Sequence, residues 1–160
     1  MPIIRPPHGD ERVSLLDIWE RSVRATHHFL GPEDIDFYRP MVRELLGSSL
    51  EFWAACREES NTPFGFMGLD RLPAAGKTAA DAWKLEALFI DPDQARRGSG
   101  ALLVRHARLL HTRPKGALIL DVNEQNPGAL AFYRRLGFVQ TGRSPVDGAG
   151  RPFPLIHMRG

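Results

Sequence analysis

The chain has 160 residues, of which 42% are hydrophobic and 25% are charged, and this length and composition suit a single domain over residues 1–160. The net charge is only +2 with scattered Lys and Arg residues, which disfavours a nucleic-acid partner, and the one cysteine, Cys56, excludes an internal disulfide or thiolate metal cluster. Because there is neither a signal-peptide h-region nor an apolar run near the roughly 20 residues of a membrane span, we expect a cytoplasmic protein without a membrane partner.

The first half of the chain predicts a strand, two helices and two further strands. A short strand at Ile3–Arg5 precedes a helix that starts at about Asp10, a favoured N-cap residue, and ends within Thr26–Phe29. A second helical segment starts at Pro32, and Pro40 inside it predicts a kink or two short helices. Two strands joined by a polar hairpin turn follow at Glu51–Arg57 and Phe64–Asp70.

The second half alternates strands with helices. A loop rich in Ala, Gly and Pro occupies Arg71–Asp81, and the glycine-bearing turn Arg96–Gly100 leads into a third helix. Asn126 opens a fourth helix, and Gly137 is a natural C′ residue for it. Strands are expected at Trp83–Ile90, Ala117–Val122, Phe138–Thr141 and Phe153–Arg159. This order predicts an α/β (α+β) fold in which a mixed sheet carries helices on both faces.

The turn before the third helix has the features of a phosphate-binding site. Gly98 and Gly100 allow the backbone to turn tightly and to approach a ligand closely. The first N–H groups of the helix and the positive end of its dipole attract a phosphate or pyrophosphate, and Arg96 and Arg97 add positive charge. A simple helix-entry turn is an equal alternative when this turn is considered alone.

The most specific motif is Asn126–Phe138, which reads Asn-Pro-Gly-Ala-Leu-Ala-Phe-Tyr-Arg-Arg-Leu-Gly-Phe. It resembles the Asn-x-x-Ala-x-x-Phe-Tyr-x-x-x-Gly-Phe stretch of the GNAT superfamily of acetyl-CoA-dependent N-acyltransferases. The resemblance covers the whole chain in element order and is closest to small bacterial acetyltransferases of the YjaB type. It implies a GNAT-like, mostly antiparallel central sheet of about seven strands, acetyl-CoA as the acetyl donor, no metal, and an amine acceptor on a small molecule, peptide or protein. Dimers are common among such proteins, so a homodimer is an open alternative.

The resemblance also implies which residues bind acetyl-CoA. The backbone of Leu88, Phe89 and Ile90 would pair with the pantetheine arm, and the N–H of Leu88 would polarise the thioester carbonyl. The pyrophosphate would lie on the turn and helix start, which comprise Gln94, Arg96, Arg97, Gly98, Ser99, Gly100 and Ala101. The chain departs from the family at Ala95, where Gln or Arg is usual, so Gln94, Arg96 or Arg97 would replace that contact. The last group comprises Asn126, which would hydrogen-bond the cofactor arm, with Ala129 and Phe132 on the same helix.

The catalytic roles follow from the same resemblance. Tyr133 occupies the family's position for the general acid that shares its proton with the CoA thiolate, although it could simply belong to the apolar face of its helix. Glu86 is the first candidate for the base that takes the amine proton, and a solvated or salt-bridged glutamate is the alternative. His27, Phe29 and Asn123 are candidates for the acceptor pocket, to which the Arg71–Asp81 loop would also contribute.

The sequence is therefore consistent with two functions from different classes. The first is an N-acetyltransferase in which a primary amine attacks acetyl-CoA directly in a ternary complex. The alternative is a non-catalytic module that binds CoA or acyl-CoA and acts as a sensor or interaction domain. The acceptor itself is not specified by any motif in the sequence.

Overall fold

The structure is a computed structural model that describes residues 1–73, 81–112 and 116–160, so most of the predicted Arg71–Asp81 loop lies outside the described residues. The chain divides into two compact units, each described by itself: unit 1 is Met1–Leu69 with Ala87–His106, and unit 2 is Asp70–Glu86 with Ala107–Gly160. None of the helices in these described segments combines the length and apolar character that crossing a membrane requires.

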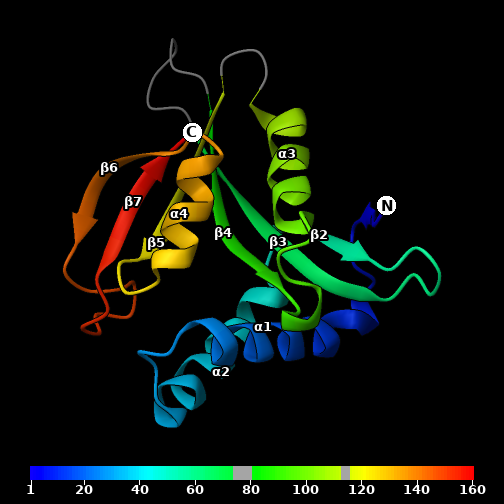
Figure 1. The fold of residues 1–160 in the computed structure, drawn as a ribbon, viewed down its shortest axis with the longest axis horizontal. Coiled ribbons are helices and arrows are strands. Elements are labelled where there is room, and N and C mark those ends of the chain that lie inside the picture. The colour runs from blue at the N-terminus through cyan, green and yellow to red at the C-terminus, as the bar shows by residue number, and fades with distance from the viewer. Residues whose placement is uncertain (74–80, 113–115) are drawn as a thin grey trace. The chain divides into compact units, whose positions relative to one another are not determined.

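The order of the elements is the one predicted from the sequence (Figure 1). The helices among the described residues are α1 (Arg12–Thr26), α2 (Pro32–Leu46), α3 (Ser99–His111) and α4 (Pro127–Arg135), with two short 3-10 helices, η1 (Gly9–Glu11) and η2 (Pro92–Gln94). The strands are β1 (Ile3–Arg5), β2 (Glu51–Cys56), β3 (Pro63–Leu72), β4 (Ala82–Ile90), β5 (Ala117–Asn123), β6 (Val139–Ser144) and β7 (Leu155–Arg159).

Within the described part of the chain the seven strands form one sheet in the order β1-β2-β3-β4-β5-β7-β6. The β1–β2, β2–β3, β5–β7 and β6–β7 pairs are antiparallel, whereas β4 and β5 are parallel. A parallel pair needs a crossover connection, and α3 lies in the segment that connects these two strands. The predicted mixed, mostly antiparallel sheet of seven strands is therefore confirmed.

Neighbouring residues of β2 show that helices cover both faces of the sheet in unit 1. The Phe52 side chain packs against a core cluster that α1 and α2 build. The ring of Trp53 instead meets His106 of α3 edge to face, with 4.3 Å between ring centroids. Because successive side chains of a strand point to opposite faces, α3 lies on the face opposite to α1 and α2, as predicted.

Some boundaries of the predicted helices and strands are wrong. The first helix starts at Arg12 and not near Asp10, because Glu11, which accepts the His8 N–H at 2.7 Å, ends a separate 3-10 turn. The β6 strand continues to Ser144, three residues beyond the predicted end, because it pairs with β7 as far as Ser144↔Leu155. Of the two outcomes predicted for Pro40, division into two short helices is excluded, because the segment is one helix.

Packing explains why Pro40 does not divide α2. A proline inside a helix removes one hydrogen bond and costs about 3 kcal/mol or more. Apolar residues on both sides of Pro40 nevertheless pack into the same core cluster of unit 1, namely Ile35, Tyr38, Val42, Leu45 and Leu46. Burial of a large apolar side chain contributes about 1.5 to 3 kcal/mol, so these contacts outweigh the local loss.

In unit 2 the last turn of α3 contacts β4 and the segment that follows α4. The Trp83 ring stacks on His111 with centroids 3.6 Å apart. The Arg108 guanidinium lies 4.6 Å from the centroid of the Phe138 ring and donates to the Leu136 carbonyl at 2.8 Å. These contacts hold the C-terminal end of α4, where Gly137 has a φ of +89° as the predicted C′ residue.

Gly65 of β3 fixes how closely the end of β4 approaches. A Cβ atom at this position would lie 2.5 Å from Ile90 Cδ1 and 3.2 Å from the Phe89 carbonyl oxygen. We therefore expect Gly65→Ala to lower the free energy of unfolding by about 1 to 3 kcal/mol, the usual cost of overpacking. Urea denaturation measures this change.

Gly148→Ala is the matched control, because nothing lies within 4 Å of its Cβ position. It should change the free energy of unfolding by less than about 0.5 kcal/mol. Equal stability of the two variants would contradict the close approach of β3 and β4.

Candidate functional site

The parallel ladder between β4 and β5 is short. It runs from Ala82↔Ala117 to Leu85↔Leu120 and ends there, although β4 continues to Ile90 and β5 to Asn123. Beyond Leu85, the edge of β4 that had faced β5 has no further ladder partner among the described pairs. Backbone N–H and C=O groups that leave a ladder need other partners, so this edge of β4 is suited to pairing with an extended ligand.

The backbone of Leu88 and Ile90 points to this free edge. The Asp91 N–H, one residue beyond the strand, donates to the Phe64 carbonyl of β3 at 2.7 Å. Because residues of an extended strand alternate in the edge to which their N–H and C=O groups point, Phe89 also faces β3, whereas Leu88 and Ile90 face away from it. The side chains of Phe89 and Ile90 are used in packing, on Phe66 and Gly65 respectively.

The turn that follows β4 places the start of α3. Arg96 and Gly98 both have positive φ, at +63° and +86°, and the exposed Arg96 is a residue type that rarely adopts this region. The Leu102 N–H donates to the Gly98 carbonyl at 3.0 Å. The three preceding N–H groups, of Ser99, Gly100 and Ala101, therefore have no acceptor within the helix. These groups and the dipole make the start of α3 a site for an anion.

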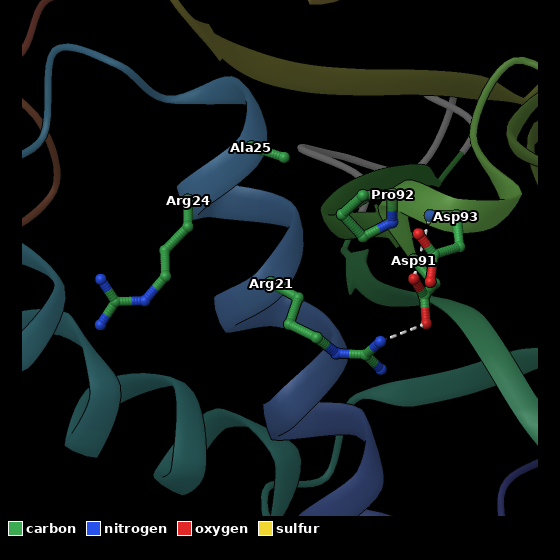
Figure 2. Close-up of a pocket in the computed structure, with 6 residues that line it drawn as sticks. All are labelled: Arg21, Arg24, Ala25, Asp91, Pro92 and Asp93. Atoms are coloured by element: carbon green, nitrogen blue, oxygen red, sulfur yellow. Dashed lines mark hydrogen bonds and ion pairs between the residues drawn. The ribbon is translucent and has the colours of Figure 1, made fainter.

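A buried carboxylate anchors this turn. Asp91 accepts the Asp93 N–H at 3.1 Å, and its other oxygen lies 2.6 Å from a guanidinium nitrogen of Arg21 on α1. Both residues line a shallow cavity of about 370 Å³, whose wall also includes Arg24, Ala25, Pro92 and Asp93. Figure 2 shows Arg21 directed at Asp91, whereas Arg24 points away from the turn. The start of the glycine turn is thus tied to both α1 and β3.

The helix α4 in unit 2 carries two of the predicted residues. Asn126 is its N-cap, and the Asn126 side-chain oxygen accepts the Ala129 N–H at 3.2 Å, which leaves the amide NH₂ group to donate elsewhere. Tyr133 is partly buried, and its ring meets Phe132 and Phe138 edge to face. Burial raises the pKa of the Tyr133 phenol well above its ordinary value, so the hydroxyl stays protonated at neutral pH.

Glu86 lies in an ion pair, which was the alternative that the sequence left open. Its carboxylate is 3.3 Å from Lys84 Nζ, and the same ammonium is 3.1 Å from the Asp121 carboxylate of β5. Burial alone would lower the pKa of Lys84, but the two carboxylates outweigh this effect and raise it. Lys84 therefore stays charged and holds both acids.

The candidates for the acceptor pocket fall into the two units. In unit 1, the His27 ring packs at 5.3 Å from that of Phe29. Burial, and to a lesser extent the neighbouring His28, lower the pKa of His27 to about 4, so it is neutral at physiological pH. In unit 2, Asn123 lies at the end of β5 and accepts the Asn126 N–H at 3.0 Å through its carbonyl.

Sequence reasoning missed several polar residues of unit 2. Asp121, His157 and Ser144 form a hydrogen-bonded chain across β5, β7 and β6. The available signal was Asp121, a charge in the otherwise apolar run Ala117–Val122. Among the described residues no group of three or more His, Cys, Asp or Glu side chains could hold a metal ion.

Comparison with known proteins agrees with this geometry. Residues 13–138 match the acetyltransferase (GNAT) family. The chain is 40% identical over 158 residues to the peptidyl-lysine N-acetyltransferase YjaB of Escherichia coli (strain K12), covering 97% of this chain and 94% of that protein. The same-named protein of Salmonella typhimurium (strain LT2) is 39% identical over 158 residues, with 97% and 95% covered.

Solved structures share the fold. The solution structure of the apo form of YjaB from Escherichia coli has a TM-score of 0.80 and 38% identity, and the match covers 99% of this chain and 97% of that one. The PaiA N-acetyltransferase of Thermoplasma acidophilum, solved in complex with coenzyme A, has a TM-score of 0.78 at 19% identity, with 99% and 98% covered. The acyltransferase class and the YjaB-type resemblance predicted from the sequence are thereby confirmed. The chain belongs to the acetyltransferase (GNAT) family.

Proposed function

We propose that this enzyme transfers the acetyl group of acetyl-CoA to the ε-amine of a lysine side chain in a peptide or protein. The acceptor class rests on the likeness, over nearly the full length, to two proteins named as peptidyl-lysine N-acetyltransferases. The observation that carries the donor is the anchored turn and free helix start at residues 91–101. Acetyl-CoA supplies the acetyl thioester, and residues of this chain bind it, orient it and transfer the protons.

The residues of unit 1 would bind the donor in two places. The N–H groups of Ser99, Gly100 and Ala101 would bind the pyrophosphate, with the exposed Arg96 and Arg97 adding charge and Gln94 beside them. The free edge of β4 would pair with the pantetheine arm, and the Leu88 N–H would donate to the thioester carbonyl oxygen as it gains negative charge. Ala95 does not impair this arrangement, because the donors are backbone groups.

The residues of unit 2 would supply the proton transfers of the same reaction. The attacking nitrogen forms a bond to the carbonyl carbon, the bond to sulfur breaks, and the nitrogen loses a proton. Tyr133, kept protonated by burial, would donate its hydroxyl hydrogen bond to the developing thiolate. Glu86 would receive the amine proton directly or through water, and Asn126, with Ala129 and Phe132, would contact the cofactor arm. Asn123, His27 and Phe29 are proposed for the acceptor.

The acceptor is tested by release of free CoA from acetyl-CoA in the presence of matched peptides. One peptide has a free lysine and a blocked N-terminus, and its partner has a free N-terminus and acetylated lysine. We expect turnover with the first and little with the second, and mass spectrometry should place the acetyl group on the lysine. Binding of CoA without turnover on any amine would instead support a non-catalytic sensor module.

Tyr133→Phe separates chemistry from binding in this assay. We expect kcat to fall by about 100-fold, within the usual range for loss of a general acid, while the Kd for acetyl-CoA changes less than twofold. The matched control is Tyr38→Phe, the other tyrosine of the chain, which should keep its activity. Unchanged turnover of Tyr133→Phe would remove this residue from the mechanism.

Arg21→Gln tests whether the anchored turn supports cofactor binding. The substitution leaves the buried Asp91 carboxylate without its cation, which should cost about 1 to 3 kcal/mol and raise the Kd for CoA about tenfold. Arg24→Gln is the control, because Arg24 lines the same cavity but, among the described residues, pairs with Glu20 one helical turn away, at 3.3 Å, and not with Asp91. Equal CoA affinities of the two variants, measured by calorimetry, would show that the ion pair does not position the turn.

A further inference from the structure

The polar face of unit 2 carries a chain of hydrogen bonds that the mechanism above does not use. Asp121 Oδ1 is 2.5 Å from His157 Nδ1, and His157 Nε2 is 2.7 Å from Ser144 Oγ. Lys84 holds the other carboxylate oxygen of Asp121 at 3.1 Å. These side-chain contacts thus link four strands in the order β4, β5, β7 and β6.

The protonation states along this chain follow from the Asp121 carboxylate. Burial alone would raise the pKa of Asp121, but hydrogen bonds from His157 and Lys84 outweigh it and lower the pKa. An ionised carboxylate can only accept hydrogen bonds, so His157 carries its hydrogen on Nδ1. The lone pair of Nε2 then accepts the Ser144 hydroxyl hydrogen. A Ser–His–Asp arrangement of this kind makes an imidazole ready to take up a proton.

The backbone of β6 makes room for the imidazole. Thr141 is an extra residue in the β6–β7 ladder, since Gln140 pairs with Met158 and Gly142 with His157. A Cβ at Gly142 would lie only 3.3 Å from His157 Cδ2. The ring therefore lies against a bare glycine, at a distance closer than a side chain there would comfortably allow.

The hydrogen-bond chain of Asp121, His157 and Ser144 lies on the same face of the sheet as Glu86, the predicted base. The side chains of residues 84 and 86 of β4 point to one face of the sheet. Lys84 pairs in register with Ile119, two residues before Asp121. Glu86 and Asp121 reach the same ammonium. The side chains of Lys84, Glu86, Asp121 and His157 each keep between about a quarter and a third of their surface exposed, so they are accessible to an acceptor and to water.

We propose that Ser144, His157 and Asp121 form a proton relay that removes the proton of the acceptor amine in the proposed acetyl transfer, on which this inference rests. The amine N–H bond breaks as Ser144 Oγ takes that proton. The original Ser144 hydroxyl proton passes to His157 Nε2, and the Asp121 carboxylate stabilises the imidazolium. His157 then releases the proton to solvent. In this relay Ser144 takes the place of Glu86 as the first acceptor of the amine proton, and the Lys84 ammonium, which Glu86 and Asp121 share, positions Asp121.

The charged groups that face His157 favour this role. Asp121 contacts it from β5, and Ser144 from β6 is neutral. Lys84 and Glu86 of β4 act through Asp121, and Arg159 lies two residues along β7 on the same face of the strand. The only direct ionic contact of the ring within the described network is thus to the Asp121 carboxylate.

The test compares His157→Ala with His157→Gln in the lysine-peptide assay. At pH 7 we expect kcat/KM to fall at least tenfold in both variants, while the Kd for acetyl-CoA and the melting temperature stay close to wild type. The loss of kcat/KM should become smaller as the pH rises toward values at which free amines deprotonate. Added imidazole should restore activity to His157→Ala but not to His157→Gln, whose side chain still fills the space. His8→Gln, at an exposed histidine, is the matched control.

A second measurement tests the relay without turnover, through the tautomer of the His157 ring. In ¹⁵N NMR of the wild-type protein, His157 should carry its hydrogen on Nδ1, and Asp121→Asn should shift the ring toward the other tautomer. Wild-type kcat/KM in His157→Gln at pH 7, or an Nε2–H tautomer in the wild type, would overturn the relay alone. Absence of turnover by the wild type on every lysine peptide would overturn the acceptor assignment and the relay together.

Discussion

The early end of the β4–β5 ladder is the constraint on which the donor site depends. Parallel pairing stops at Leu85↔Leu120 while both strands continue. The strand beyond this point keeps its pairing to β3, as the Asp91–Phe64 hydrogen bond shows. Its opposite edge, with Leu88 and Ile90, has no further ladder partner among the described strand pairs and could pair with a ligand. Gly65 permits the close approach of the β3 and β4 backbones that fixes this edge in place.

Ion pairs have a different role in each of the two units. In unit 1 the buried Asp91 carboxylate, satisfied by Arg21 and the Asp93 N–H, orients a turn whose later N–H groups are left free for an anion. In unit 2 the Lys84 ammonium joins two carboxylates, and one of them orients an imidazole. The first arrangement suits binding of a diphosphate by backbone donors. The second suits proton transfer from an amine.

The sequence predicted the elements well because their signals are local. Asn126 before an apolar helix and Gly137 after it are cap residues that act within one turn, and both behave as predicted. Pro40 does not divide α2, because residues on both of its sides pack into the core of unit 1. The relay was missed because Asp121, His157 and Ser144 are far apart in the sequence, and only the β5–β7–β6 register brings them together. The Arg21–Asp91 pair likewise depends on a long-range contact.

The account rests on backbone groups as the donors to CoA, and amide hydrogen exchange measured by NMR tests this most directly. On addition of CoA, exchange should slow at Leu88 and Ile90 and at Ser99–Ala101, because their free N–H groups become hydrogen-bonded. The start of α2, where the Asp34 N–H already donates to the Gly31 carbonyl at 3.1 Å, should not change. Saturation with CoA that leaves exchange at Leu88, Ile90 and Ser99–Ala101 unaltered would contradict the account.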